Sequence, residues 1–449
     1  MLVACADILS IDHYRPCEGA ECTAGVDASD EMLVDAPADA PADATTDTQP
    51  EAAGAPCSTS SECAPAAPVC SSSKCASILS LSSGMSAFQC VVLSDFTARC
   101  WGTSNPYAEL GAGPSSAPTK PTTVLDSNGT APLANIQKIV TGLAYACALT
   151  LDGSVYCWGT DVVAPALLPT FVLSDVRDIS GAGGVNAGEG SMCAVRSDST
   201  LSCWGFNYDG RIACPSSDMM PDAGACTGTS VNLPPTVLTS ASAVAANTDT
   251  TCAFLGSPWN LQCWGTNSFG GIGAGSLESA PCCSAGTTGV IEGGAVSIVA
   301  GDAYTCALSS TAGWYCWGLS QGGAILGAQP NSIVASPLHS AVPSAGYSPG
   351  WAHGCAVAGD GSGHVQCWGQ NDHGQVGNGT TNAVGDYVLT PVTVSKLVGV
   401  TLASSHRNFT CAKNGDGQIY CWGQNIYGPL LGAGNSTADI TSPAVVVWD

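Results

Sequence analysis

The sequence predicts an all-β fold, a seven-bladed β-propeller, and three observations support this prediction. The tripeptide Cys-Trp-Gly occurs seven times at intervals of 46 to 60 residues, and self-similarity at such a period is typical of repeat architectures. A second cysteine precedes each copy by 10 to 12 residues, across a segment with hairpin signals. About four short strands are expected in each repeat, as in the blades of a propeller.

The segment from Cys147 to Cys157 shows how the hairpin is built. Leu151-Asp152-Gly153 predicts a three-residue loop with Gly153 in the left-handed conformation. Counting outward from this loop, the two cysteines face each other as a non-hydrogen-bonded pair with Cα atoms roughly 4.5 Å apart. This separation suits a disulfide. The seven expected pairs are Cys90 with Cys100, Cys147 with Cys157, Cys193 with Cys203, Cys252 with Cys263, Cys306 with Cys316, Cys355 with Cys367, and Cys411 with Cys421.

Two further strands are expected ahead of each hairpin. One is a strand-like stretch that ends in a small residue, as at 136–142 and 296–301, and before it there is often a proline-led run, as at 121–125, 235–238 and 391–394. The first repeat lacks such a run, whereas the chain finishes with one at 442–447. We therefore expect the C-terminal strand to complete the first blade and close the ring, which hides the sheet edges. An open β-solenoid is the alternative, and it would need capping units.

The segment 367–379 reads Cys-Trp-Gly-x-Asn-x-x-Gly-Gln-Val-Gly-Asn-Gly. It resembles the regulator of chromosome condensation repeat, and the resemblance covers about 79–449. The Gly-Gln-x-Gly tail is clean in the sixth copy, altered in the third at 208–213 and absent in the second. The resemblance implies a seven-bladed binding ring. The best-known member of the family is a nuclear exchange factor for a small GTPase, and another branch includes a secreted bacterial β-lactamase inhibitor and plant photoreceptors. Because of its cysteines, we expect this chain to fall in a bacterial, disulfide-rich extracellular branch.

Four segments are expected along the chain. Residues 1–26 hold a lipobox-like N-terminus and a short segment in which Cys17 and Cys22 are candidates for a disulfide. Residues 27–56 form an acidic linker rich in proline and alanine, of the composition that stays disordered. Residues 57–76 form a small four-cysteine module, and residues 77–449 form the propeller. The module's cysteines, which allow three connectivities, are Cys57, Cys63, Cys70 and Cys75.

The cysteine content indicates an oxidising compartment. The chain has 25 cysteines in evenly spaced pairs, with no zinc-type Cys-x-x-Cys pairs. Leu2-Val3-Ala4-Cys5 matches the bacterial lipobox, and setting Cys5 aside as a lipidated residue leaves an even 24. A chance tetrapeptide is the alternative, and the missing basic and apolar segments before Leu2 leave open whether Met1 is the true start. We expect an extracellular or outer-membrane location, with contact to the membrane only through the lipid anchor.

Charge and motifs exclude several function classes. The chain has 35 acidic and 11 basic residues with no basic cluster, which argues against nucleic-acid binding. No catalytic motif, cofactor motif or metal-ligand spacing is found. His353, His364 and His373 fall in one repeat, but strand parity does not bring them together. The repeated tryptophans are expected to pack between blades rather than to bind a ligand.

Two cysteine-bearing insertions are the candidate binding loops. One follows the third Cys-Trp-Gly and runs from Cys214 to Cys226, with Met219, Met220 and Pro221 as an apolar tip. The other follows the fourth copy and carries Cys282 and Cys283. Cys214 could pair with Cys226, and Cys282 and Cys283 could pair together or reach the neighbouring loop. Neutral loop drift is the alternative interpretation.

These observations predict a monomeric, non-enzymatic extracellular or cell-surface scaffold that binds or adheres to a protein or glycan. Inhibition of a secreted enzyme is an alternative, by analogy with the β-lactamase inhibitor. Guanine-nucleotide exchange is implied by the family resemblance but disfavoured by the disulfides. A hydrolase with its site at the ring centre is a further alternative.

Overall fold

The computed structural model describes residues 54–448 except 83, 85, 103–104, 114–119, 161–164, 184–188, 208–209, 213–235, 257–259, 268, 276–283, 288–290, 312, 321–323, 326–330, 338–343 and 426–437. The described residues belong to one unit, Pro50–Asp449. They form strands and a single 3₁₀ turn, η1 (Ser60–Glu62). None of the helical structure described in this unit is long and apolar enough to span a membrane.

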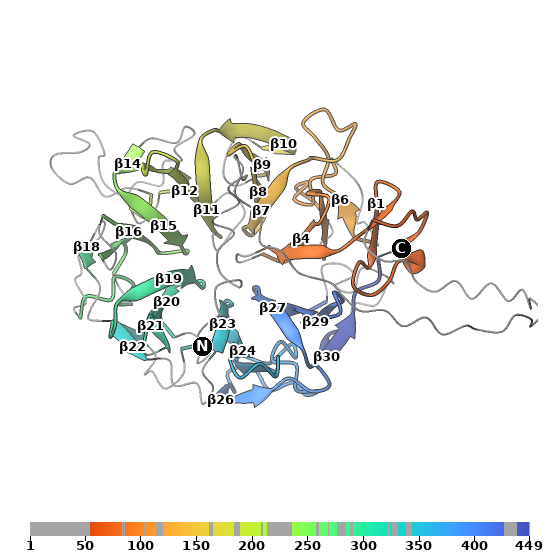
Figure 1. Cartoon of the computed structure of the whole chain (residues 1–449). Helices are drawn as coiled ribbons and strands as arrows, with labels where there is room; N and C mark the ends of the chain where they lie inside the picture. The colour runs from red at the N-terminus through yellow and green to blue at the C-terminus, as the bar shows by residue number, and fades with distance from the viewer. Residues whose placement is uncertain are drawn as a thin grey trace, which may run out of the picture. The chain divides into compact units, whose positions relative to one another are not determined.

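Seven four-stranded antiparallel sheets surround a common centre in chain order (Figure 1), which confirms the seven-bladed propeller. Blade 1 is β3 (Ile78–Leu81), β4 (Gln89–Leu93), β5 (Ala98–Trp101) and β6 (Thr122–Thr123); blade 2 is β7 (Ile136–Thr141), β8 (Tyr145–Thr150), β9 (Val155–Gly159) and β10 (Ala166–Leu173); blade 3 is β11 (Val176–Ala182), β12 (Ser191–Arg196), β13 (Leu201–Gly205) and β14 (Thr236–Leu238); blade 4 is β15 (Ala241–Ala246), β16 (Thr250–Leu255), β17 (Leu261–Gly265) and β18 (Ser284–Thr287). Blade 5 is β19 (Ala295–Ala300), β20 (Tyr304–Ser309), β21 (Gly313–Leu319) and β22 (Asn331–Pro337); blade 6 is β23 (Ser344–Pro349), β24 (His353–Ala358), β25 (Val365–Gly369) and β26 (Val388–Thr393); blade 7 is β27 (Val400–Ser405), β28 (Phe409–Asn414), β29 (Ile419–Gly423) and β30 (Ile440–Val445).

The cysteine hairpins have the predicted register. Cys147 faces Cys157 and Leu149 faces Val155, and Gly153 has a φ of 80°. The Cα atoms of Cys147 and Cys157 lie 4.1 Å apart, and a disulfide joins the two residues. The other six hairpins form their expected disulfides too. Each blade therefore carries one covalent link between its second and third strands.

The prediction that the C-terminal strand completes the first blade is wrong. β30 pairs with β29 inside blade 7, and blade 1 has its own fourth strand, β6. The proline-led runs are thus the last strands of their blades and not the first. Proline cannot donate a ladder hydrogen bond, so these runs suit an outer edge. The first strands lie nearest the centre, where the blades crowd together and small residues such as those of Ala241–Ala246 fit best.

Packing, and not a shared strand, closes the ring between blade 7 and blade 1. Ile78, Trp101, Phe409 and Val446 belong to one buried cluster that spans the two blades. Trp448 adds an edge-to-face contact with Trp101, at 5.4 Å between the ring centroids.

The four-cysteine module lies over this seam. It contains η1 and a hairpin of β1 (Val69–Ser71) and β2 (Lys74–Ala76). Disulfides join Cys57 to Cys70 and Cys63 to Cys75, which decides the connectivity that the sequence left open. Val69 and Ala76 join the buried cluster of the seam. The module also contacts both blades: the Arg99 guanidinium of blade 1 donates to the Cys70 carbonyl at 3.1 Å, and the Pro65 carbonyl lies so close to Gly417 of blade 7 that a side chain there would clash with it.

The tryptophans of Cys-Trp-Gly pack between neighbouring blades, as predicted. Seven buried clusters each draw residues from two adjacent blades, so that every interface is filled. Five of the indole N–H groups also donate to the preceding blade, each to the carbonyl at the Gln position of its Gly-Gln-x-Gly tail. The pairs are Trp158 with Glu109, Trp264 with Arg211, Trp317 with Gly271, Trp368 with Ala324, and Trp422 with Gln375. Because the backbone accepts the bond, the side chain at this position is free to vary.

The second repeat, which lacks the tail, shows what the tail does. Trp204 of blade 3 faces blade 2 and is fully buried, yet its Nε1 has no hydrogen-bond partner among the described residues. In the complete tails the last glycine is required sterically. A Cβ on Gly377, whose φ is 75°, would lie 2.6 Å from Nε1 of Trp422. The tail is therefore an interface element, and its loss leaves a buried donor unsatisfied.

Candidate functional site

The site is built from the turns between the first and second strands of the blades. Strands alternate in direction within a blade, so these turns lie at one end of the ring, beside the innermost strands (Figure 1). We call this end the central face. The third strands end there too, and the connections that follow them carry the two sequence insertions.

A belt of hydrogen bonds joins neighbouring blades at or near the central face. Each of the seven interfaces has at least one such bond between described residues. In order around the ring, the paired residues are Thr141 with Ser86, Tyr145 with Ala182, Thr248 with Gly183, Thr248 with Asp302, Tyr304 with Tyr347, Trp351 with His406, and Arg407 with Ser86. A bond of this kind contributes on the order of 1 kcal/mol. The belt holds the turns of separate blades in fixed relative positions.

Four partly or largely buried residues from four successive blades meet on this face. We call Thr248, Asp302, Trp351 and Arg407 the central cluster. The Thr248 hydroxyl lies 2.5 Å from the Asp302 carboxylate, and the Trp351 backbone N–H donates to the His406 carbonyl of the next blade at 3.2 Å. The Arg407 guanidinium carbon lies 5.3 Å from the Trp351 ring centroid, a cation–π distance. Asp302, Trp351 and Arg407 each keep part of their surface exposed.

Burial raises the pKa of Asp302, although Thr248, Trp351 and the charges of Arg407 and Arg211 oppose the shift. The Thr248 hydroxyl has one hydrogen and faces two acceptors, Asp302 and the Gly183 carbonyl at 3.1 Å. A protonated Asp302 could donate to Thr248, which would free the hydroxyl hydrogen for Gly183. The central cluster therefore holds a carboxyl group for which the charged form is disfavoured.

Arg211 supports the central cluster through the backbone of Thr248. It occupies the Gln position of the altered third tail and is 3% exposed. Its guanidinium donates to the backbone carbonyls of Thr248, Glu189 and Phe206. It thus ties the fourth-blade turn to the third blade. The departure from the repeat at 208–213 has a structural use here, because a glutamine has fewer donors than this cation.

Two histidines lie fully buried near the central face. His406 contacts the Ser86 hydroxyl at 2.9 Å and the Gln89 side-chain oxygen at 2.7 Å, across the blade 7 to blade 1 interface. His353 contacts the Thr410 hydroxyl at 2.9 Å, across the blade 6 to blade 7 interface. Burial lowers the pKa of each to about 3. Both rings are neutral structural groups at neutral pH.

The binding loops predicted from the sequence lie outside the described residues. This holds for Cys214, Met219, Met220, Pro221, Cys226, Cys282 and Cys283, and equally for Cys5, Cys17 and Cys22. His353, His364 and His373 make separate contacts: His353 with Thr410, and His373 with Asp439 at 2.8 Å, while His364 is exposed.

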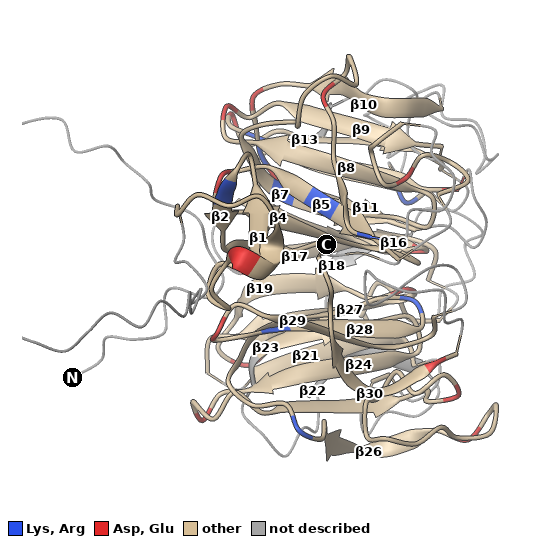
Figure 2. Cartoon of the chain, turned by 90° about the vertical axis from the view of Figure 1, so that its right-hand side faces the viewer, with Lys and Arg blue, Asp and Glu red and all other residues tan. Residues whose placement is uncertain are grey.

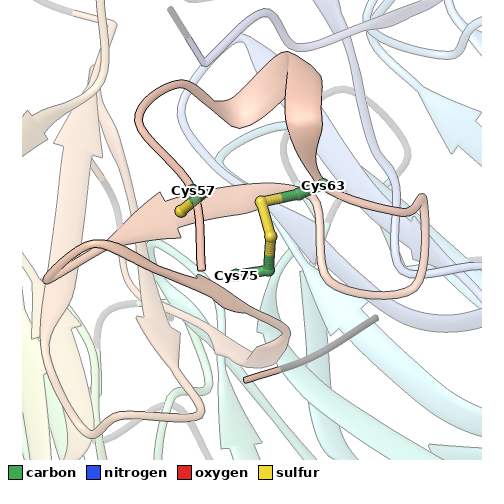
Figure 3. A group of neighbouring side chains, drawn as sticks. All are labelled: Cys57, Cys63 and Cys75. Carbon is green, nitrogen blue, oxygen red and sulfur yellow. A yellow bond between two sulfur atoms is a disulfide. The ribbon is translucent and has the colours of Figure 1, made fainter. Parts of the chain in front are cut away.

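The sulfur atoms of Cys57, Cys63 and Cys75 lie within 4.8 Å of one another, the spacing of a metal cluster. Figure 3 shows the bond between Cys63 and Cys75. Cys57 is bonded to Cys70. With every sulfur in a disulfide, no thiolate is left to bind a cation, and the group is a structural staple.

Sequence reasoning missed the central cluster. Its members each stand four residues before the first hairpin cysteine of blades 4 to 7, where the first three repeats have Ser86, Leu143 and Glu189. Aligning the seven turns would have drawn attention to this position as one at which the repeats differ in size and charge. The proximity of the four cluster residues follows from the ring and is not visible in the sequence.

Comparison with known proteins agrees with this architecture. Two segments, 362–412 and 136–162, match profiles described as the regulator of chromosome condensation (RCC1) repeat. Protein RCC2 homolog of Xenopus laevis is 28% identical over 135 residues, which are 30% of this chain and 23% of that protein. The human E3 ubiquitin-protein ligase HERC2 is 26% identical over 291 residues, 59% of this chain and 6% of that protein. The matches thus cover less than a quarter of these relatives.

Solved structures share the fold. Prp20p of Saccharomyces cerevisiae, whose structure was described with its binding to Gsp1p and histones, superposes with a TM-score of 0.63 at 18% identity, over 83% of this chain and 87% of that one. Human WBSCR16 gives a TM-score of 0.51 at 18% identity, over 62% and 69% of the two chains. Identities this low show a common fold and carry no information about partners.

Proposed function

We propose that this chain, as an RCC1-repeat propeller, is a non-enzymatic scaffold. In this proposal it binds a protein partner outside the cell through its central face. The observation that carries the proposal is the central cluster: an aromatic side chain and an arginine, partly exposed and held in place by bonds to neighbouring blades. Tryptophan and arginine are enriched among the residues that dominate interface energies. A surface that is ordered before binding loses less entropy when the partner arrives.

Nine disulfides among the described residues support an extracellular site of action. Disulfides in such number form and persist in oxidising compartments. The net charge of −24 favours a partner with a positively charged surface, since opposite charges accelerate association. Charged residues are sparse along the strands of the propeller (Figure 2).

Attachment to a membrane through Cys5 belongs to the same proposal. The lipobox Leu2-Val3-Ala4-Cys5 and the even number of remaining cysteines support it. Mass spectrometry of membrane-extracted protein is expected to find a diacylglyceryl group on Cys5. An unmodified peptide that runs through Leu2 to Asp7 would show that the chain is not anchored there.

The test of function is capture under non-reducing conditions. The immobilised full chain is exposed to proteins from the surface and surroundings of the producing cell, beside Trp351→Ala. Wild type is expected to retain a specific protein that salt releases, and Trp351→Ala is expected to retain at least about tenfold less, the effect of losing a hot-spot residue. Capture of a glycan and no protein would show that the partner is a glycan and not a protein. Capture of a protein equally by both forms would place the site elsewhere on the ring. A captured enzyme that loses its activity would identify the chain as an inhibitor.

A further inference from the structure

The Arg407 side chain differs from every other arginine that the structure describes. Four of them use their guanidinium groups inside the protein, where they donate to neighbouring carbonyl or hydroxyl groups. Those four are Arg99, Arg177, Arg196 and Arg211. The Arg407 guanidinium donates to no described residue. Its position comes from the Trp351 ring and from the backbone, whose N–H donates to the Ser86 carbonyl at 3.3 Å.

The nearby carboxyl group of Asp302 does not pair directly with this cation. Arg407 forms no ion pair within 4.0 Å with the described acidic residues, Asp302 included. The Asp302 carboxylate accepts a hydrogen bond from the Thr248 hydroxyl instead. The Trp351 backbone is held by its hydrogen bond to the His406 carbonyl, and the Trp351 ring lies against the guanidinium. Arg407 is therefore a preorganised cation with its planar set of donors unused, on a partly exposed surface.

This arrangement suits a planar anion. A guanidinium group donates two parallel hydrogen bonds to a carboxylate, and the Trp351 ring holds the Arg407 guanidinium within cation–π distance. A partly desolvated guanidinium also gains more from such a pair than an exposed one.

We propose that the Arg407 guanidinium, supported by Trp351, binds a carboxylate group of the protein partner. The inference rests on the proposed function and names the chemistry that the central face recognises.

The test uses the full chain and four peptide probes in isothermal titration at low salt. Tetraglutamate and tetraglutamine, both blocked at the two ends, separate charge from shape. Tetraglycine with a free or an amidated C-terminus distinguishes a chain-terminal carboxylate from a side-chain carboxylate. One carboxylate probe is expected to bind, and its uncharged counterpart is expected to bind at least about tenfold more weakly, as for loss of a charge-assisted pair.

Arg407→Gln and Arg196→Gln are the matched variants. Arg196 ends β12 at the opposite end of the ring, so its loss is expected to leave probe binding unchanged. Arg407→Gln is expected to weaken it at least about tenfold, and Arg407→Lys to restore it only in part, because an ammonium group lacks the planar donor set. Circular dichroism verifies that each variant is folded.

Equal binding by wild type and Arg407→Gln, or no binding of any carboxylate probe, overturns the inference. Tetralysine serves as an additional cationic control. If it binds and no carboxylate probe does, the inference is likewise overturned. In each of these cases capture of a partner that depends on Trp351 would leave the proposed function standing. Loss of capture, with carboxylate binding intact, would overturn the function alone.

Discussion

Acidification is expected to destabilise the propeller through its two buried histidines, His353 and His406. Both have a pKa near 3 in the folded protein, because burial disfavours the charged ring, against 6.5 for an exposed histidine. A proton therefore binds the unfolded chain more readily than the folded one between these two values. The contribution of each ring to stability is complete above pH 6.5 and is lost as the pH falls toward 3.

The magnitude follows from the two pKa values. Between about pH 7.5 and about pH 5, each histidine removes about 2 kcal/mol from the free energy of unfolding, so the pair removes about 4 kcal/mol. Asp302 acts in the opposite direction, because its folded pKa is raised and it gains stability as the pH falls. The folded pKa of about 3 for His353 already includes the charge of Asp372, which favours the protonated ring.

Equilibrium urea unfolding with intact disulfides, monitored by tryptophan fluorescence, measures how the free energy of unfolding changes across this pH range. His353→Phe is the informative variant, because Phe88 and Phe409 occupy the same position relative to the hairpin cysteine in blades 1 and 7. With one histidine removed, the free energy of unfolding is expected to fall by only about 2 kcal/mol between about pH 7.5 and about pH 5. The exposed His364 supplies the control, and His364→Gln is expected to keep the wild-type slope. If His353→Phe keeps the full slope, His353 is not the buried neutral group described here.

Two further predictions concern the contact between tryptophan and tail. Gly377→Ala is expected to lower the free energy of unfolding by about 2–4 kcal/mol, since the added methyl group meets Trp422 at a residue with positive φ. The control is Gly385→Ala, which also has a positive φ but no atom within 4 Å of the added methyl group, and it is expected to cost about 1 kcal/mol. Equal losses of the two variants in urea unfolding would disprove the steric explanation. Trp422→Phe removes the bond to the Gln375 carbonyl and is expected to cost about 1 kcal/mol more than Trp204→Phe, whose indole N–H has no described partner. A larger loss at Trp204 in the same assay would contradict this reading of the missing tail.

The tail missing from blade 2 affects the interface between blades 2 and 3, and the altered tail of blade 3 affects the interface between blades 3 and 4. At the first, Trp204 loses a partner. At the second, Arg211 gains three carbonyl partners and braces the turn that holds Thr248. One departure from the repeat thus removes a hydrogen bond between blades, and the other adds one. The added bond, from Arg211, supports the turn that carries Thr248 of the central cluster.

Local features of this chain could be predicted from the sequence because they depend on residues close together in it. The hairpin from Cys147 to Cys157 is an example: the loop Leu151-Asp152-Gly153 determines the pairing, and the pairing determines the disulfide. The number of blades follows from the number of hairpins. The burial of the repeated tryptophans follows from their strict recurrence.

The tertiary structure decided everything that depends on which segments become neighbours. A proline-led run such as 391–394 can pair with the strand before it or the strand after it, since both are an equally short distance away along the chain. Its pairing with the Cys-Trp-Gly strand, which keeps β30 in blade 7, comes from packing. Thr248, Asp302, Trp351 and Arg407 are separated from one another by about fifty residues at each step. They become one site because a closed ring brings successive turns to the same end, and no pattern within a single repeat encodes that contact.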